Sequence, residues 1–254
     1  MIDCDAVASE ATAEDADPRL DPERVRCLPG DGDRGSVLVV GVVHDHPASV
    51  YRAVHLVTGA DPDVLALELP PLSVPLFRRY ARDRHTPPRL GGEMSAAVRA
   101  AGAVPVVGID APNARYLRTL AARLRGAGSR DLAVAVARDT ARGVAQAVAC
   151  RLGAVVARLT PYTPRLYTQI PYESTLLDAP GAQATHEERH LARHRAFVGV
   201  VKAPPATALI DRAREDVMAA RLHELRVRGD VVAVVGATHL DPLADRLAAL
   251  AGDG

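Results

Sequence analysis

Tryptophan, lysine and cysteine are the residue types that this sequence has least of. The chain of 254 residues contains no tryptophan, a single lysine (Lys202) and three cysteines. The cysteines stand at positions 4, 27 and 150, too few and too scattered for a disulfide framework or a cysteine-type zinc site. We therefore expect neither of these.

An excess of charge of either sign is also missing. Lysine plus arginine and aspartate plus glutamate both total 31, so the formal net charge is zero. Proteins that bind nucleic acid normally carry a basic excess, because they neutralise phosphates. The balance predicts that nucleic acid is not a partner.

Long uncharged apolar runs are absent as well. A membrane-spanning helix needs about 18 or more apolar residues, and the longest candidate, residues 131–159, is interrupted by Arg138, Asp139, Arg142 and Arg151. The acidic N-terminus has neither the basic nor the apolar region of a secretory signal. We expect no membrane span and a cytoplasmic protein.

What the sequence does contain is an alternation of short apolar runs with helical patterns. The apolar runs are residues 37–43, 64–67, 104–109 and 231–235, and the helical patterns are residues 48–58, 93–101, 115–125 and 207–228. Continuous β-branched runs are typical of strands buried on both faces of a parallel sheet. The alternation predicts an α/β fold with a mostly parallel central sheet flanked by helices.

Two segments depart from this alternation. Residues 1–34 are acidic and predict a loose tail with an edge strand near 25–28, ahead of a single α/β domain over 35–254. Residues 131–200 predict an insertion: an alanine-rich helix, a proline- and tyrosine-rich loop over 159–174, and a second helix over 185–197. We expect residues 160–200 to cover or rim a site rather than to form a separate domain.

Two of the apolar runs end in the same motif, glycine followed three residues later by histidine (GxxH). "GVVH" ends at His44 and "GATH" ends at His239, and each is followed by a proline that suits a first helical turn. His46 and Asp241 precede these prolines and can cap the two helices. Turn chemistry explains the glycine and the proline but not the histidine, so both histidines are candidate site residues.

The other two apolar runs end in carboxylates, Glu68 and Asp110. Each has an ordinary explanation by itself, as a solvated loop residue or a helix cap. Parallel strands, however, deliver their carboxyl ends to one edge of the sheet, where α/β proteins bind ligands. Two histidines and two carboxylates at one edge predict a functional site.

Glu93 and Arg214 extend this set. Glu93 begins a predicted helix, where the helix dipole by itself would also stabilise a negatively charged side chain. Arg214 shares a helical row with Met218, Leu222 and Leu225. A guanidinium on an apolar row meets a carboxylate or an anionic ligand, so a structural ion pair and a role in the site are equally good interpretations.

At these residues the chain resembles the TraB/PrgY family of pheromone-shutdown proteins, and more distantly the Tiki, GumN-like, ChaN-like and erythromycin-esterase-like proteins. The matching motifs are "GVVH", "ADPDVLALELP", "GGEMSAAVRAAGAVPVVGID", "AREDVMAARL" and "VVGATHL". They cover about residues 36–118 and 207–247. The middle of the chain shows no match, and the usual acid before the helix arginine is Ala213. We expect none of the C-terminal membrane helices that many archaeal relatives carry.

The resemblance implies an α/β fold with a paired GxxH site, which in the Tiki branch is proposed to be a divalent-metal-dependent peptidase. It singles out the following residues: His44, Glu68, Glu93, Asp110, Arg214 and His239.

Histidine and carboxylate ligands suit Mn²⁺, Co²⁺, Zn²⁺ or Fe²⁺, any of which can activate water. We expect His44 and His239 to be metal ligands or proton carriers, and Glu68 to be a ligand or a general base. Glu93, Asp110 and Arg214 are the other catalytic candidates, and Arg214 would bind a carboxylate or an oxyanion. The predicted activity is hydrolysis of a peptide or small molecule.

Two alternatives stay open. A non-catalytic protein could sequester a peptide or small ligand in the same cleft. A metal could instead bind to His186, His190 and His194, which lie four apart on one helix face, although the interleaved charges are more typical of a solvated face.

Walker, GxGxxG, GxSxG and HExxH motifs are absent, so no nucleotide cofactor is expected. The oligomeric state stays open, with a homodimer among the alternatives.

Overall fold

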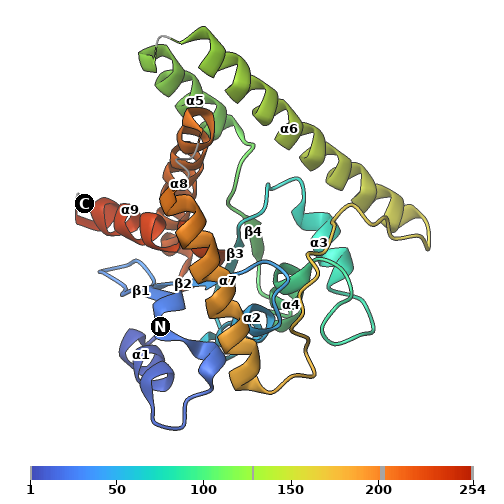
Figure 1. The fold of residues 1–254 in the computed structure, drawn as a ribbon, viewed down its shortest axis with the longest axis vertical. Helices are drawn as coiled ribbons and strands as arrows, with labels where there is room; N and C mark the ends of the chain where they lie inside the picture. Colours follow the sequence, from blue (N-terminus) through green and yellow to red (C-terminus); the bar gives the residue numbers. More distant parts are fainter. Residues whose placement is uncertain (1, 128, 201–203, 253–254) are drawn as a thin grey trace.

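A five-stranded sheet forms the centre of the computed structural model, which describes residues 2–127, 129–200 and 204–252 (Figure 1). The strands are β1 (Val25–Leu28), β2 (Val37–Val42), β3 (Val64–Leu67), β4 (Val106–Gly108) and β5 (Val231–Gly236). Their spatial order is β1-β2-β5-β3-β4. β2, β5, β3 and β4 run parallel, and β1 pairs antiparallel with β2 at the edge.

Helices cover both faces of the sheet. They are α1 (Cys4–Thr12), α2 (Pro47–Ala60), α3 (Val74–Tyr80), α4 (Gly92–Ala100), α5 (Ala114–Ala127), α6 (Arg130–Leu159), α7 (Pro180–Val200), α8 (Pro205–Leu225) and α9 (Leu240–Gly252). Short 3₁₀ turns span Pro18–Leu20, Pro22–Arg24, Arg226–Arg228 and Ala237–His239. The prediction of an α/β fold with a mostly parallel sheet flanked by helices is confirmed.

Alternate residues of the strands enter two hydrophobic cores. Leu38, Leu65 and Val232 face the core covered by α2, α3 and α4. Their neighbours Val39 and Ala233 face the other core, which α8 and α9 cover. Both faces of the central strands are therefore buried away from solvent, which is why the sequences of these strands are continuous apolar runs.

The sequence pattern located the strands and helices closely, except for α3 and α1. The predicted strand over 104–109 is shorter, at Val106–Gly108, and the predicted helix over 207–228 ends at Leu225 before a 3₁₀ turn. The helix α3 was not predicted. It lies in "VPLFRRY", where a proline and seven residues give too little periodicity to recognise.

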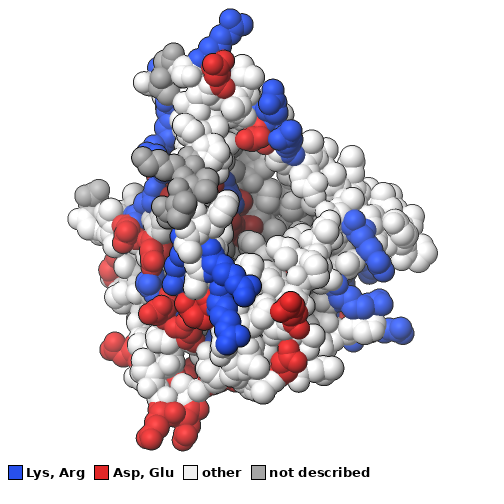
Figure 2. Space-filling view, viewed as in Figure 1, with Lys and Arg blue, Asp and Glu red and all other residues white. Residues whose placement is uncertain are grey.

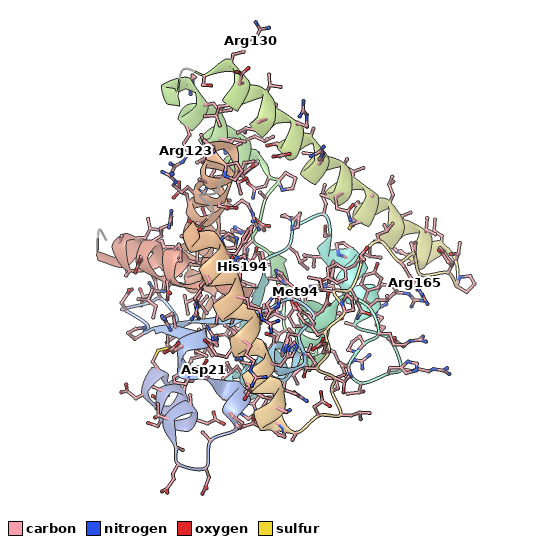
Figure 3. All side chains as sticks on the ribbon, viewed as in Figure 1. Asp21, Met94, Arg123, Arg130, Arg165 and His194 are labelled. Atoms are coloured by element: carbon pink, nitrogen blue, oxygen red, sulfur yellow. A yellow bond between two sulfur atoms is a disulfide. The ribbon has the colours of Figure 1, made fainter. Side chains whose placement is uncertain are left out.

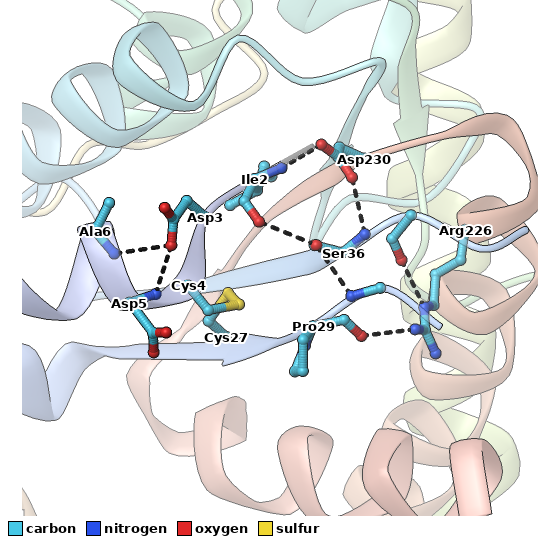
Figure 4. The surroundings of a disulfide bond; sticks show 12 residues. Ile2, Asp3, Cys4, Asp5, Ala6, Cys27, Pro29, Ser36, Arg226 and Asp230 are labelled. Carbon is cyan, nitrogen blue, oxygen red and sulfur yellow. Dashed lines mark hydrogen bonds between the residues drawn. A yellow bond between two sulfur atoms is a disulfide. The ribbon is translucent and has the colours of Figure 1, made fainter. Parts of the chain in front are cut away.

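The prediction of a loose N-terminal tail is wrong. Residues 4–12 form α1, and Cys4 makes a disulfide with Cys27 of β1, a bond that the sequence analysis did not expect. Figure 4 shows this bond beside Ser36, whose hydroxyl donates to the carbonyl of Ile2 at 3.1 Å. Ile2 is itself buried in the core. The edge strand predicted near 25–28 is confirmed as β1.

Residues 131–200 form two long helices joined by an irregular loop. α6 packs against α3 and α8, whereas α7 packs against α2 and the 3₁₀ turn at Pro18–Leu20. Residues 160–179, between the two helices, are mostly irregular, with a few turns and bends. Among the described residues, no helix combines the length and hydropathy needed to span a membrane.

Candidate functional site

The two GxxH turns lie side by side at the carboxyl edge of the sheet. β2 and β5 pair directly, with Gly41 opposite Val235 and Val42 opposite Gly236, so the prediction that these strands are adjacent and parallel is confirmed. A Cβ atom at Gly236 would lie 3.3 Å from Glu68 Oε2 and 3.4 Å from His44 Nε2. Both polar atoms therefore point toward the same small space beside Gly236. We call His44, Glu68, Asp110, Arg214 and His239 the strand-end site.

His44 is held by a buried carboxylate at the start of α4. Its Nδ1 lies 2.7 Å from Glu93 Oε1, and the second carboxylate oxygen accepts the amide of Asp45 at 2.8 Å. Because a carboxylate only accepts, Nδ1 carries the proton and Nε2 is left for the site.

The same contact sets the charge of His44. Burial disfavours the imidazolium, but the hydrogen bond and charge of Glu93, with the charge of Glu68, raise the pKa of His44 to about 9. The His44 side chain is 40% exposed, so it can reach a ligand from solvent.

His239 is held in a parallel way from the other side. Its Nδ1 lies 3.1 Å from Glu215 Oε1 on α8, and Arg246 of α9 bonds the other Glu215 oxygen at 2.9 Å. Its Nε2 lies 3.2 Å from Arg214 Nη1 and 3.5 Å from Glu68 Oε1. A neutral ring accepts from Arg214, whereas an imidazolium would donate to Glu68. Burial opposes the charged form, but the hydrogen bond to Glu215 and the charge of Glu68 raise the pKa of His239.

Arg214 lies at the centre of these groups. Its Nη2 donates to Glu68 Oε1 at 2.6 Å and to Asp110 Oδ2 at 2.8 Å, and its Nε donates to Asp110 Oδ1 at 2.9 Å. Glu68 also accepts the amide of Gly236 at 2.5 Å.

Burial disfavours ionised Glu68, yet the charges of Arg214 and His239 hold the pKa of this carboxyl below its ordinary value. The structure thus brings all six predicted residues together: five in the strand-end site and Glu93 behind His44.

The expected metal ligands do not form a three-ligand centre. The guanidinium of Arg214 lies between Glu68 and His239, and the second nitrogen of each histidine is occupied by a glutamate. Within residues 2–127, 129–200 and 204–252, no group of three or more histidine, cysteine or acidic residues is arranged to hold a metal ion. As placed, these residues do not fit the predicted centre, and the divalent metal stays a prediction.

The loop after α6 contacts the turn that carries His44. Tyr172 donates its hydroxyl to the carbonyl of His44 at 3.0 Å. Tyr167 and the amide of Ile170 both donate to Asp45 Oδ2, at 3.0 and 2.9 Å. Asp45 has a left-handed backbone with φ of 62°, and these bonds hold it there. The proline- and tyrosine-rich segment therefore lies at the rim of the strand-end site.

The histidine helix α7 lies next to the site without joining it. His186 Nδ1 lies 2.9 Å from Nε2 of His46, which caps α2 as expected. His194, labelled on α7 in Figure 3, is exposed. The idea that this helix presents a solvated face is wrong for Glu187, which is 3% exposed and forms an ion pair with the fully buried Arg52.

Sequence reasoning missed Glu215, Asp45, Gly236 and the two tyrosines as parts of the site. Glu215 carried a signal, because it shares a helical row with Ala219 and Leu222 in a buried helix. Gly236 was interpreted only as a residue that suits the turn after the strand. The proline- and tyrosine-rich loop was expected to cover or rim a site, but the sequence did not show that Tyr167 and Tyr172 contact the His44–Asp45 turn, since such contacts follow from tertiary packing.

The chain matches no protein-family model, no curated protein and no solved structure. The resemblance to the TraB/PrgY family therefore stays a prediction.

Proposed function

We propose that the protein is a hydrolase that acts on a peptide or a small molecule at the strand-end site. One observation carries the proposal: two histidine–glutamate pairs, His44–Glu93 and His239–Glu215, flank Glu68 at the carboxyl edge of a parallel sheet. A histidine whose far nitrogen is fixed by a carboxylate is a typical proton-transfer group in hydrolysis. A purely structural turn has no need of two such pairs.

The charges assign different roles to the residues. His44, with a pKa of about 9, is protonated near neutral pH and can donate a proton to a leaving nitrogen or oxygen. Glu68, kept ionised beside Gly236, can accept a proton from the attacking water. Water adds to the carbonyl carbon, the bond to the leaving group breaks, and the products are a carboxylic acid and an amine or alcohol.

Arg214 and Asp110 act through other residues. Every nitrogen of the Arg214 guanidinium already bonds a group of the site, so its donors hold Glu68 and His239 rather than a substrate. Asp110 orients the guanidinium with two bonds. These two residues are positioning residues, and the mechanism above uses no metal.

The proposal is tested by turnover of excess substrate. A panel of unstructured peptides and of aryl esters is incubated with wild-type protein, with and without Mn²⁺, Co²⁺ or Zn²⁺. We expect consumption of many equivalents, with a rate that falls as pH rises through about 9, where His44 loses its proton. His44→Gln should lower kcat/KM by about 10²- to 10⁴-fold, whereas His194→Gln, on the exposed part of α7, should not.

Binding that saturates at one equivalent without product would replace the hydrolase by the alternative, a protein that sequesters its ligand. Equal losses in His44→Gln and His194→Gln would show that the strand-end site does not carry the activity.

A further inference from the structure

A cluster of positively charged side chains lies away from the strand-end site, between α3 and the C-terminal half of α6. A hollow of about 520 Å³ there is lined by Arg78, Arg79, Arg82, Arg151 and Arg158, which we call the arginine groove. Its other lining residues are Pro75, Ala154, Val155 and Ala157, so no described acidic residue lines it. Five positive charges thus surround one hollow in a chain whose net charge is zero.

These arginines have few partners inside the protein. Arg78 makes one long hydrogen bond, from Nη2 to the carbonyl of Val106 at 3.4 Å. The side chains of the other four form no hydrogen bond or ion pair within the described part of the chain. The neighbouring carboxylate of Asp83 is directed elsewhere, to His85 and Arg89.

Helix dipoles explain only part of this cluster. Arg78, Arg79 and Arg158 lie in the last turns of their helices, where a positive charge is favourable. Arg82 follows α3 and Arg151 lies two turns before the end of α6, so neither is accounted for in this way. Bringing guanidinium groups together from two distant segments costs repulsion, and an anion in the hollow removes that cost.

Small residues of α6 face α3 and the following loop beside the groove. At Gly153 an added Cβ would lie 2.6 Å from Leu166 Cδ1 and 3.7 Å from Leu76 Cδ2, so this small residue lets the side chain of Leu166 pack directly against α6. Ala154 and Ala157 continue the small surface beside the hollow. The right-hand side of Figure 2, beside and below the end of α6, shows basic side chains without acidic ones among them.

We propose that the arginine groove binds a ligand that carries two or more phosphate groups. A planar guanidinium group can donate two parallel hydrogen bonds to the oxygens of one phosphate. Several guanidinium groups around one hollow therefore favour a multiply charged anion over a single carboxylate. The phosphates belong to a free phosphorylated molecule or to a phosphorylated lipid headgroup. The exposed Leu152 and Leu159 on the same part of α6 would contact the bilayer in the second case.

The test uses tripolyphosphate as the probe, with the whole protein in a phosphate-free buffer and isothermal titration calorimetry as the readout. Wild type should bind one equivalent with an affinity that weakens as salt rises. The double variant Arg82→Gln/Arg151→Gln should bind at least about tenfold more weakly. The control is Arg130→Gln/Arg138→Gln, which removes the same charge from exposed positions in the first half of α6, where Figure 3 labels Arg130 far from the groove. It should match wild type.

A second arm separates the two sources of phosphate. Phosphatidylcholine vesicles with and without phosphatidylinositol bisphosphate are sedimented with each variant. Sedimentation that needs this lipid and the groove arginines assigns the ligand to a headgroup, and tripolyphosphate binding without sedimentation assigns it to a free molecule.

Failure of both probes to bind wild type overturns the proposal, and so does an equal loss in the groove and control variants. Neither result bears on hydrolysis at the strand-end site, which shares no lining residue with the groove.

Discussion

His44 is the residue on which the chemistry of the site depends most, because its charge state is set by a neighbour that the fold has fully buried. Glu93 has no exposed surface, and its two carboxylate oxygens accept hydrogen bonds from the His44 ring and the Asp45 amide. A buried carboxylate in this position keeps a partly exposed imidazole charged at neutral pH. The arrangement yields a proton donor that solvent and substrate can both reach.

The raised pKa of His44 predicts how stability depends on pH. The folded pKa of about 9 lies above the ordinary value of 6.5, so His44 stabilises the fold fully below pH 6.5. This contribution is lost as pH rises from 6.5 through about 9. Melting temperatures of wild type and His44→Gln, measured across this window, should therefore converge as pH rises. Curves that stay parallel would contradict the assignment.

Replacing Gly236 by alanine should lower activity much more than it lowers the stability of the fold. Its φ of −58° suits any residue, so the only obstacle to alanine is the close approach of Glu68 and His44. Gly236→Ala should cost at most about 1–3 kcal/mol of stability but lower kcat/KM by about 10²-fold, because the reacting groups are displaced. Gly59→Ala, at a position with open space, is the control. Unchanged kinetics in Gly236→Ala would place the chemistry elsewhere.

At the scale of elements, the strands and their ends were predictable and the contacts between distant segments were not. Continuous apolar runs fix buried parallel strands, and their last residues then share one edge, which is why His44, Glu68, Asp110 and His239 could be grouped. Glu215 and the tyrosine contacts depend on how α8 and the loop after α6 settle on that edge.

The N-terminal segment was misread for a related reason. Cys4 and Cys27 are far apart in sequence, and only the folded chain shows that α1 brings one beside the other. Disulfides are rare in cytosolic proteins, so the bond argues against the cytoplasmic location, which stays a prediction.

The contact between α2 and α7 predicts a large stability effect at Glu187. This carboxylate receives the guanidinium of Arg52 and the hydroxyl of Ser49, all of them buried. Burial opposes ionisation, but the charge of Arg52 keeps the pKa of Glu187 low, so the pair is charged. Glu187→Gln leaves Arg52 without its counter-charge and should cost about 3–5 kcal/mol in urea unfolding.

The matched control for Glu187 is Asp139→Asn, which removes an exposed partner of Arg142 and should cost less than about 1 kcal/mol. Equal small effects in both variants would show that α7 is not held to α2 by this pair.

At the scale of the whole molecule, the geometry beside Gly236 predicts where a metal would bind. His44 Nε2 and Glu68 Oε2 both approach the same point beside Gly236. Any stabilisation by Mn²⁺, Co²⁺ or Zn²⁺, about 2.7 kcal/mol at a hundredfold excess over Kd, should therefore vanish in His44→Gln and persist in His190→Gln. Melting temperatures with each metal measure this. Loss of the effect in His190→Gln alone would move the metal to α7.

The central claim is that the two GxxH turns form one site, and a double-mutant cycle on turnover tests it most directly. The measurement is kcat/KM for wild type, His44→Gln, His239→Gln and the double variant, with the best substrate of the panel. If both histidines serve one reaction, each single variant loses about 10²- to 10⁴-fold and the double variant is little worse than the slower single variant. Losses that multiply, or a single variant as active as wild type, would contradict the claim.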